Sequence, residues 1–420
     1  MRLSTGIIAV LTLVLATVGT AQTIPGLPVL VGLEAPSGFD NLTNGVTDQT
    51  THDADRATFE EVDDISPAGL GPVYNAQGCF ECHQDPVSGA ASQVTELRVG
   101  SVVGGVFVNP TVPINDGANT ITGRTLINDR AICPQAQEHV PPGNPIRTFR
   151  ISLNLLGDGF VENVPDLELL ALAALNGGVA IQVPILESPG QVGVGRFGWK
   201  DQHASLLSFS ADAYLNEQGV TNRLLPTEVT TVCNPDGIAE PNDVANDIDT
   251  FARFMRALKT PPVDATLAAT AAAQRGSVLF DQIGCNKCHI RTLVTAPAGI
   301  SPGPGRPPPP AALAGKLFHP FSDFLLHDIG TGDGISIAPV EHWGPAAALY
   351  KTGSDVTRNR MRTAPLWGLR MRDRLMHDGE TLTVTEAIQR HKGEAQVPAA
   401  HFNALNAADT QAVLTFLQSL

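Results

Sequence analysis

Two short stretches of the chain carry the residue types that bind haem covalently. They read GCFECH (Gly78–His83) and GCNKCH (Gly284–His289), and both have the spacing Cys-x-x-Cys-His. At this spacing two thiols one turn apart each add to a vinyl group of haem, and the next imidazole points at the iron from one face. We therefore predict two covalently bound haem c groups, which the thioether bonds keep from dissociating.

Two other interpretations of these motifs fit less well. A zinc site needs four ligands, usually from two pairs about 12 to 20 residues apart, and no second pair stands near either motif. A thioredoxin-like dithiol needs a strand–helix–strand setting and does not require a histidine after the second cysteine.

The haem motif gives each of its residues one role. Any distal iron ligand must come from elsewhere in the chain, and its identity sets the redox potential and the openness of the iron to substrate. The predicted proximal ligands are His83 and His289, and the predicted thioethers are at Cys79, Cys82, Cys285 and Cys288.

Residues 1–21 are typical of a cleaved signal peptide. They hold one Arg, an apolar run from Gly6 to Val18, and small residues before Gln22. A membrane anchor needs about 20 apolar residues; this run is shorter, and no later segment is apolar enough. We predict an exported, periplasmic protein with no membrane span after cleavage.

Two of the six cysteines lie outside the haem motifs, Cys133 and Cys233. Disulfides persist in an oxidising compartment, so a bridge between these two is the economical prediction. Two unrelated thiols are the alternative.

The composition describes a folded protein of about two or three domains. Of its 420 residues 43% are hydrophobic and 16% are charged, while 40 Gly and 32 Pro favour short helices set in long loops. A net charge of −15 argues against nucleic acid or an anionic membrane as a partner.

The chain divides into two related units, each opened by Cys-x-x-Cys-His and closed by an amphipathic helix. The closing helices are predicted over residues 247–259 and 408–420 from their apolar spacing. Alternating apolar residues between 98 and 160 favour short strands. The Pro- and Gly-rich stretch 296–312 excludes regular structure.

Longer stretches around these motifs resemble the di-haem oxidoreductase family of peroxidases or thiol oxidoreductases. They are GLGPVYNAQGCFECHQDPVSGAASQVTELR, GRFGWKDQHASLLSFSADAYLNEQGVTN, HPFSDFLLHDIGTG and RTAPLWGLRMRDRLMHDGETLTVTEAIQRHKGEA, and the resemblance covers about Gly69 to Leu420. The family is similar to bacterial di-haem cytochrome c peroxidases, which carry calcium between their domains. No calcium-loop spacing stands out here, so calcium stays an open alternative.

From these features we expect a mainly α fold. It comprises two cytochrome c-like haem domains, residues 22–262 and 263–420, with a β-containing insertion over about 98–160 in the first. The resemblance implies a small electron-donor protein as partner, such as a cytochrome or a cupredoxin, and peroxide or another small oxidant as substrate.

A helix near the C-terminus is predicted to carry the distal ligand of the second haem. Thr383 and Glu386 form a capping box, so a helix should run over about residues 384–392. A histidine on its apolar face, His391, is either a core residue or a ligand. The resemblance favours ligation, because the helix after His377–Gly379 carries this ligand in related peroxidases. The competing ligands are Met361, Met371 and Met376, which we expect to pack in the core instead.

The resemblance also suggests residues around both haems. Arg362 occupies the place where related enzymes hold a haem propionate, and Arg196 looks like its counterpart in the first unit. Cleaving an O–O bond at the first haem needs a group that moves a proton. The candidates are Gln202, His203 and Glu217, and His203 is also a candidate distal ligand. Trp199 and Trp367 are either electronic bridges or core residues.

Two functions remain open from the sequence. The first is a peroxidase-like enzyme with electron entry at the second haem and oxidant reduction at the first. The second is an electron carrier whose two haems are both six-coordinate. Oxidation of thiols or of a protein partner cannot be separated from the first by sequence.

Overall fold

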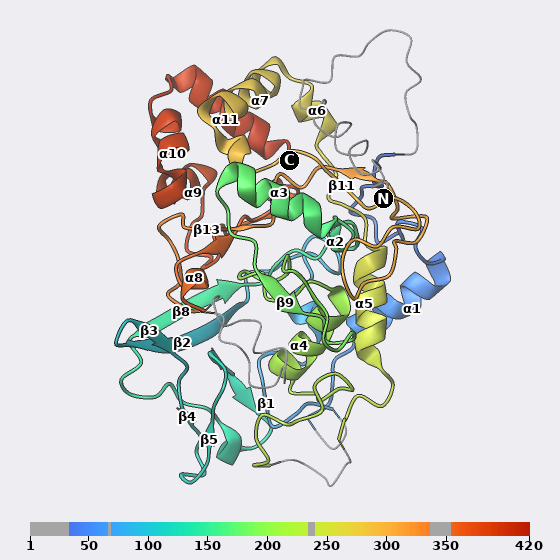
Figure 1. Ribbon diagram of the computed structural model, residues 1–420, viewed down its shortest axis with the longest axis vertical. Helices are drawn as coiled ribbons and strands as arrows, with labels where there is room; N and C mark the ends of the chain where they lie inside the picture. The colour runs from blue at the N-terminus through green and yellow to red at the C-terminus, as the bar shows by residue number, and fades with distance from the viewer. Residues whose placement is uncertain (1–32, 66–68, 234–239, 337–353) are drawn as a thin grey trace, which may run out of the picture. The chain divides into compact units, whose positions relative to one another are not determined.

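The computed structural model describes residues 33–65, 69–233, 240–336 and 354–420 (Figure 1), so the predicted signal peptide lies outside the described residues. The α-helices are α1 (Gln49–Phe59), α2 (Asp158–Glu162), α3 (Asp166–Asn176), α4 (Leu206–Gln218), α5 (Asp247–Ala257), α6 (Ala265–Ala268), α7 (Ala271–Ile283), α8 (Ser354–Thr357), α9 (Val384–Arg390), α10 (Gln396–Asn403) and α11 (Ala407–Gln418). The short 3-10 helices are η1 (Cys79–Glu81), η2 (Pro134–Ala136), η3 (Cys285–Lys287), η5 (Leu369–Met371) and η6 (Gly393–Ala395).

The strands are short, and most of them pair as two-stranded ribbons. They are β1 (Val73–Tyr74), β2 (Thr95–Val103), β3 (Val106–Val108), β4 (Val112–Pro113), β5 (Thr120–Ile121), β6 (Leu126–Ile127), β7 (Arg130–Ala131), β8 (Ile146–Ile151), β9 (Gln182–Pro184), β10 (Val192–Val194), β11 (Leu293–Val294), β12 (Leu317–Phe318), β13 (Leu326–His327) and β14 (Met361–Arg362).

Helices α7 and α11 pack against each other around the second haem motif (Figure 1). The Thr270 side chain caps α7 by accepting a hydrogen bond from the amide of Ala273. Gly276 lets the helices approach, since a Cβ there would lie 1.9 Å from the Ala412 carbonyl oxygen. Gly284, at φ 95°, ends α7 and leads directly into the Cys-x-x-Cys-His turn.

Helices α1, α4 and α5 surround the first haem motif. The Ser205 side chain caps α4 by accepting from the amide of Ser208. Tyr214 of α4 meets Phe251 of α5 edge to face, with ring centres 5.1 Å apart, and Phe251 in turn meets Phe59 of α1. The predicted closing helices are confirmed as α5 and α11, and each ends two residues earlier than expected.

The predicted β-rich region forms a four-stranded sheet centred on β2. Strand β8 pairs with one edge of β2 from Thr95↔Ile151 to Gly100↔Ile146, and β6 and β3 pair with the other edge. The first strand begins at Thr95, before the predicted start at 98, and α2 already lies within the predicted range. Strands therefore occupy this region, and its status as an insertion stays a prediction.

The expected mainly α character is too strong a description. Helix exceeds strand in the described residues, but the pairs of short strands make the fold mixed. Residues 34–420 cluster as one compact unit, and the predicted boundary at residue 262 stays a prediction. Among the described helices, none combines the length and apolar content that a membrane-crossing helix needs.

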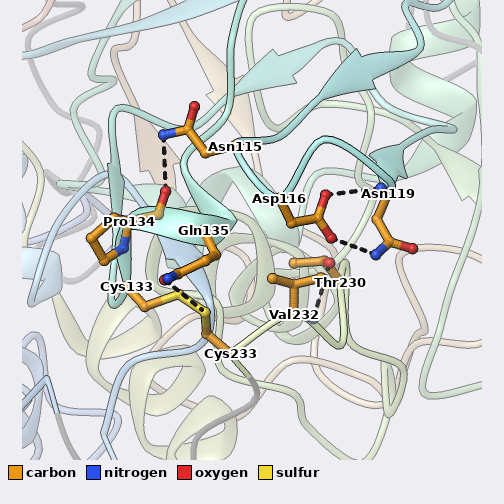
Figure 2. Close-up of a disulfide and its surroundings, with 9 residues drawn as sticks. All are labelled: Asn115, Asp116, Asn119, Cys133, Pro134, Gln135, Thr230, Val232 and Cys233. Carbon is orange, nitrogen blue, oxygen red and sulfur yellow. Dashed lines mark hydrogen bonds between the residues drawn. A yellow bond between two sulfur atoms is a disulfide. The ribbon is translucent and has the colours of Figure 1, made fainter.

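The predicted disulfide between Cys133 and Cys233 is present (Figure 2). It ties the β-rich region to the segment that follows α4. Beside it, the Asn115 side chain donates to the Pro134 carbonyl oxygen at 2.9 Å. The bridge joins residues 100 positions apart, so it removes much conformational freedom from the unfolded chain.

We expect the double substitution C133S/C233S to lower the free energy of unfolding by about 2–4 kcal/mol, because the unfolded chain gains entropy without the bridge. Urea unfolding of the oxidised protein and the variant measures this difference. Haem content should not change, since neither residue contacts a haem motif. Equal unfolding midpoints for the two proteins would contradict the expectation.

Candidate functional site

The first haem motif lies in the wall of a cavity between α4, α5 and β2. The His83 ring nitrogen Nδ1 lies 3.1 Å from the Ala90 carbonyl oxygen. A carbonyl only accepts, so Nδ1 carries the proton and Nε2 is left as the iron-binding atom. Burial lowers the pKa of His83, which keeps the imidazole neutral as a ligand must be. We name this space the first cavity.

The second haem motif lies in a similar cavity between α7, α9 and η5, which we name the second cavity. Here Nδ1 of His289 lies 2.9 Å from the Phe321 carbonyl oxygen, so Nε2 is again left for iron. Burial lowers the pKa of His289 to about 4.

The second cavity brings His391 opposite His289. The capping box of Thr383 and Glu386 is present, and α9 ends at Arg390 with His391 as its C-cap. Nδ1 of His391 donates to the Ala387 carbonyl oxygen at 2.7 Å, and burial lowers its pKa.

The distance between these two rings suits a shared iron. Metal–imidazole bonds are about 2 Å and the bonded nitrogen lies roughly 1 Å from its ring centre, so two rings on one metal have centres about 6 Å apart. The centres of His289 and His391 are 6.5 Å apart.

Both cavities fit a haem in size and chemistry. Their empty volumes are about 1170 Å³ for the first and 1470 Å³ for the second, part of it open to solvent. Each is lined mostly by apolar atoms and contains two cysteines free of disulfides. Haem would be held by Cys79, Cys82 and His83 in one cavity and by Cys285, Cys288 and His289 in the other.

Trp199 lines both cavities. Its side chain is buried, and its indole N–H donates to the Ile151 carbonyl oxygen at 2.8 Å, which fixes the ring. Trp367 lines neither cavity and packs against Phe318 in the core. Of the two tryptophans, only Trp199 has the placement of an electronic bridge.

A pair of carboxyl groups lies in the first cavity. Glu217 of α4 hydrogen-bonds to Glu96 of β2 and accepts from the Asn75 side chain at 2.7 Å. Burial and the charge of Glu96 raise the pKa of Glu217 to about 8. Burial would raise the pKa of Glu96 as well, but the two hydrogen bonds from Arg98, both 2.8 Å, help lower it. At neutral pH Glu217 is therefore a neutral acid beside an ionised carboxylate.

The two other proton-transfer candidates lie at different depths. Gln202 lines the first cavity, and Gly198 at φ 77° makes room for it, since a Cβ there would lie 2.2 Å from Gln202 Oε1. His203 is fully buried and does not line the cavity. Its Nε2 lies 3.1 Å from Asp212 Oδ2, and Asp212 does line the cavity. This placement suits action through Asp212 rather than direct iron ligation.

The two arginines predicted to hold haem propionates differ in their placement. Arg196 lines neither cavity; its guanidinium is fully buried and donates to Asp166 and to the Val164 carbonyl oxygen at 2.6 Å. Its guanidinium donors join loops of the chain, and its role as a propionate partner stays a prediction. Arg362 does line the second cavity, and its buried Nε has no hydrogen-bond partner in the described residues. That donor fits a haem carboxylate.

The three methionines named as competing ligands differ in how buried they are and in whether they line the second cavity. Met371 is 37% exposed, which contradicts its expected core packing. Met361 is buried in a core cluster with Trp199 and also lines the second cavity, as does Met376.

An ion cluster lies beside the first cavity. Asp333 is fully buried and pairs with Lys200 Nζ at 2.7 Å and with Arg150 Nε at 2.8 Å. Lys200 Nζ also donates to the carbonyl oxygens of Thr357 and Arg360. Arg150 lines the first cavity, so the cluster joins that wall to the loop before β14.

Sequence reasoning missed Glu96, Arg98 and Asp212. The available signal was the alternation in Thr95-Glu96-Leu97-Arg98, which puts the two charged side chains on one face of a strand. Asp212 lies on α4 five residues before Glu217, and only the placement of α4 shows that both reach the cavity.

The chain resembles known proteins both in sequence and in structure. A family model described as "Di-haem oxidoreductase, putative peroxidase" matches residues 144–420. Among curated proteins, none matches the chain.

The chain is also similar to several solved structures, at sequence identities of 14–16%. Hydrazine synthase of Kuenenia stuttgartiensis has 14% identity and a TM-score of 0.41, covering 96% of this chain and 98% of that one. A MauG-like protein associated with microbial copper homeostasis has 16% identity and a TM-score of 0.40, covering 94% and 95%. The diheme peroxidase BthA from Burkholderia thailandensis E264 has 15% identity and a TM-score of 0.40, covering 93% and 94%.

Proposed function

The chain belongs to the di-haem oxidoreductase family, and from that premise we propose that it is an exported c-type di-haem enzyme that reduces peroxide or a similar small oxidant. Electrons enter at the second haem, and the oxidant is reduced at the first. With peroxide, two electrons and two protons convert one molecule into two waters.

The unlike surroundings of the two haem motifs carry this proposal. The second cavity offers a second imidazole, His391, at the distance of a shared iron. Among the described residues that line the first cavity, His83 is the only histidine, and the carboxyl pair of Glu96 and Glu217 lies there instead. A closed electron-transfer site and an open site with an acid are what a peroxidase needs.

Bound haem would supply electron storage and the iron at which peroxide binds. The chain supplies one of the two protons: Glu217, neutral at pH 7, donates it to the departing oxygen, while Glu96 stays ionised beside Arg98 and the second proton comes from solvent. The Gln202 amide offers hydrogen bonds to a bound oxidant. Trp199 joins the two cavities through a ring fixed by its hydrogen bond to Ile151.

The partners and location follow from the same proposal. Residues 1–21 direct the chain to the periplasm, where a small cytochrome or cupredoxin delivers electrons. A calcium site is the remaining question. Among the described residues, one group of His, Cys, Asp and Glu side chains is close enough together to hold a metal ion: Cys288, Asp323 and His327. Sulfur and imidazole donors do not suit calcium.

The alternative is an electron carrier with two six-coordinate haems. In the first cavity the ligand would then be Met255 or Tyr214, which line it, rather than His203, which does not. Cyanide or azide separates the functions. The enzyme changes its visible spectrum through the first haem, whereas a carrier leaves the spectrum unchanged and shows no peroxide turnover.

Peroxide turnover should fall as the pH rises through about 8. Glu217 donates only while protonated, and its raised pKa of about 8 keeps it protonated at neutral pH. The rate is therefore full below this pKa and lost above it. Initial rates with a small artificial electron donor, measured from about pH 6 to pH 10, test this. A rate that stays flat across that range contradicts the role of Glu217.

A further inference from the structure

His327, in the stretch HPFSDFLLHDIGTG, lies between two carboxylates at the edge of the second cavity. Its Nε2 is 2.9 Å from Asp323 Oδ2, and its Nδ1 is 2.8 Å from Glu394 Oε2. His327 is 2% exposed and the Asp323 side chain is fully buried, whereas the Glu394 side chain is 32% exposed. We name these three residues the ion triad.

Both ring nitrogens of His327 have a carboxylate as a hydrogen-bond partner. Carboxylate oxygens accept hydrogen bonds, so both ring nitrogens donate. The ring is then an imidazolium that compensates two carboxylates. Burial alone would lower the pKa of His327, but the hydrogen bonds to Asp323 and to the Cys288 sulfur, together with the charges of these two residues, raise it.

Gly178 leaves the space that the His327 ring occupies. A Cβ at Gly178 would lie 2.6 Å from His327 Nε2 and 2.8 Å from its Cε1, so a larger residue at 178 would displace the ring. The strand that carries His327 is also fixed by the backbone pairing of Val179 with Leu326.

The ion triad joins both sides of the second haem site. On the proximal side, Nδ1 of His327 is 3.7 Å from the sulfur of Cys288, the residue before His289. Asp323 lies two residues after Phe321, whose carbonyl accepts from His289. On the other side, Glu394 follows His391 by three residues.

His391 itself depends on the residues that follow it. It is the C-cap of α9, with an extended backbone at φ −70° and ψ 116°, so the helix holds it from one side only. From the other side, Lys392 and Glu394 donate backbone hydrogen bonds, both 2.8 Å, to the carbonyl oxygens of Ile329 and Asp328. The Glu394 carboxylate adds the charged contacts of this attachment, to His327 at 2.8 Å and to Arg360 at 3.6 Å.

We propose that His327, through its contacts with Asp323 and Glu394, clamps the segment carrying His391 to the segment carrying the second Cys-x-x-Cys-His motif, and so keeps the second haem closed to outside ligands. The inference rests on the proposed ligation of the second haem by His391. His327 is a positioning residue here, since it touches neither the iron nor a substrate.

The test uses the full-length protein with both haems and counts carbon monoxide molecules bound per reduced protein. The wild type should bind one, at the first haem. In E394Q and H327Q, His391 should be displaced, and binding should rise from one towards two, with a matching high-spin signal in the oxidised protein. D409N is the control: Asp409 pairs with Arg275 in the same half of the chain, outside both cavities, and this variant should bind one.

The outcomes separate the clamp from the wider proposal. Glu394 is partly exposed, so E394Q keeps its fold most readily; if folded E394Q binds one carbon monoxide like the wild type, the clamp is overturned. If the wild type already binds two, the ligation by His391 fails first. No peroxide turnover enters the measurement, so the enzyme proposal stands or falls separately.

Discussion

Replacing Glu217 with glutamine lowers the rate of peroxide reduction by a factor of about 10²–10⁴, the range that a positioned general acid contributes. Glutamine keeps the size of the side chain and can still accept from Asn75. It cannot release a proton to the departing oxygen. Steady-state rates at neutral pH, with haem content matched by absorbance, measure the effect.

E168Q is the matched control for this substitution. Burial also raises the pKa of Glu168, to about 7, but this residue lies on α3 outside both cavities. We expect its rate to stay within about twofold of the wild type, since surface and structural carboxyls add nothing to proton transfer. If E217Q and E168Q are equally active, Glu217 is not the acid.

Replacing Asp333 with asparagine lowers the free energy of unfolding by about 3–5 kcal/mol, the cost of leaving a buried charge without its partner. The Asp333 carboxylate lies between Lys200 and Arg150, at 2.7 and 2.8 Å, with no exposed surface. The asparagine has no charge to balance the two cations. Urea unfolding at neutral pH gives the difference.

An exposed ion pair provides the comparison for D333N. Asp40 pairs with Lys259 at 2.9 Å, but the Asp40 side chain is 44% exposed. Water and salt screen such pairs, so D40N should cost no more than about 1 kcal/mol. Equal losses in D333N and D40N would mean that the buried cluster does not hold the wall of the first cavity to the loop before β14.

Local features of the site could be predicted from the sequence because short-range chemistry dictates them. The capping box of Thr383 and Glu386 sets where α9 begins, and three to four residues per turn then put Ala387, Ile388 and His391 on one face. The haem motifs are equally local, since five consecutive residues supply the thiols and the ligand.

Contacts between distant segments could not be predicted in this way. Glu96 and Glu217 are far apart in the sequence, and their pairing depends on how β2 lies against α4. Arg196 illustrates the same limit: its position in a family-like stretch suggested a haem partner, whereas in the structure its donors bond to Val194, Val164 and Asp166. A guanidinium's role depends on which acceptors surround it, and these come from separate parts of the chain.

The two haem irons should differ in spin state, because only the second has a histidine on each side. Low-temperature paramagnetic resonance of the oxidised protein counts high-spin and low-spin irons separately. We predict one of each: a low-spin iron held by His289 and His391, and a high-spin iron held by His83 with its sixth position open. Two low-spin irons in every redox state, or a protein that carries no haem at all, would contradict the account.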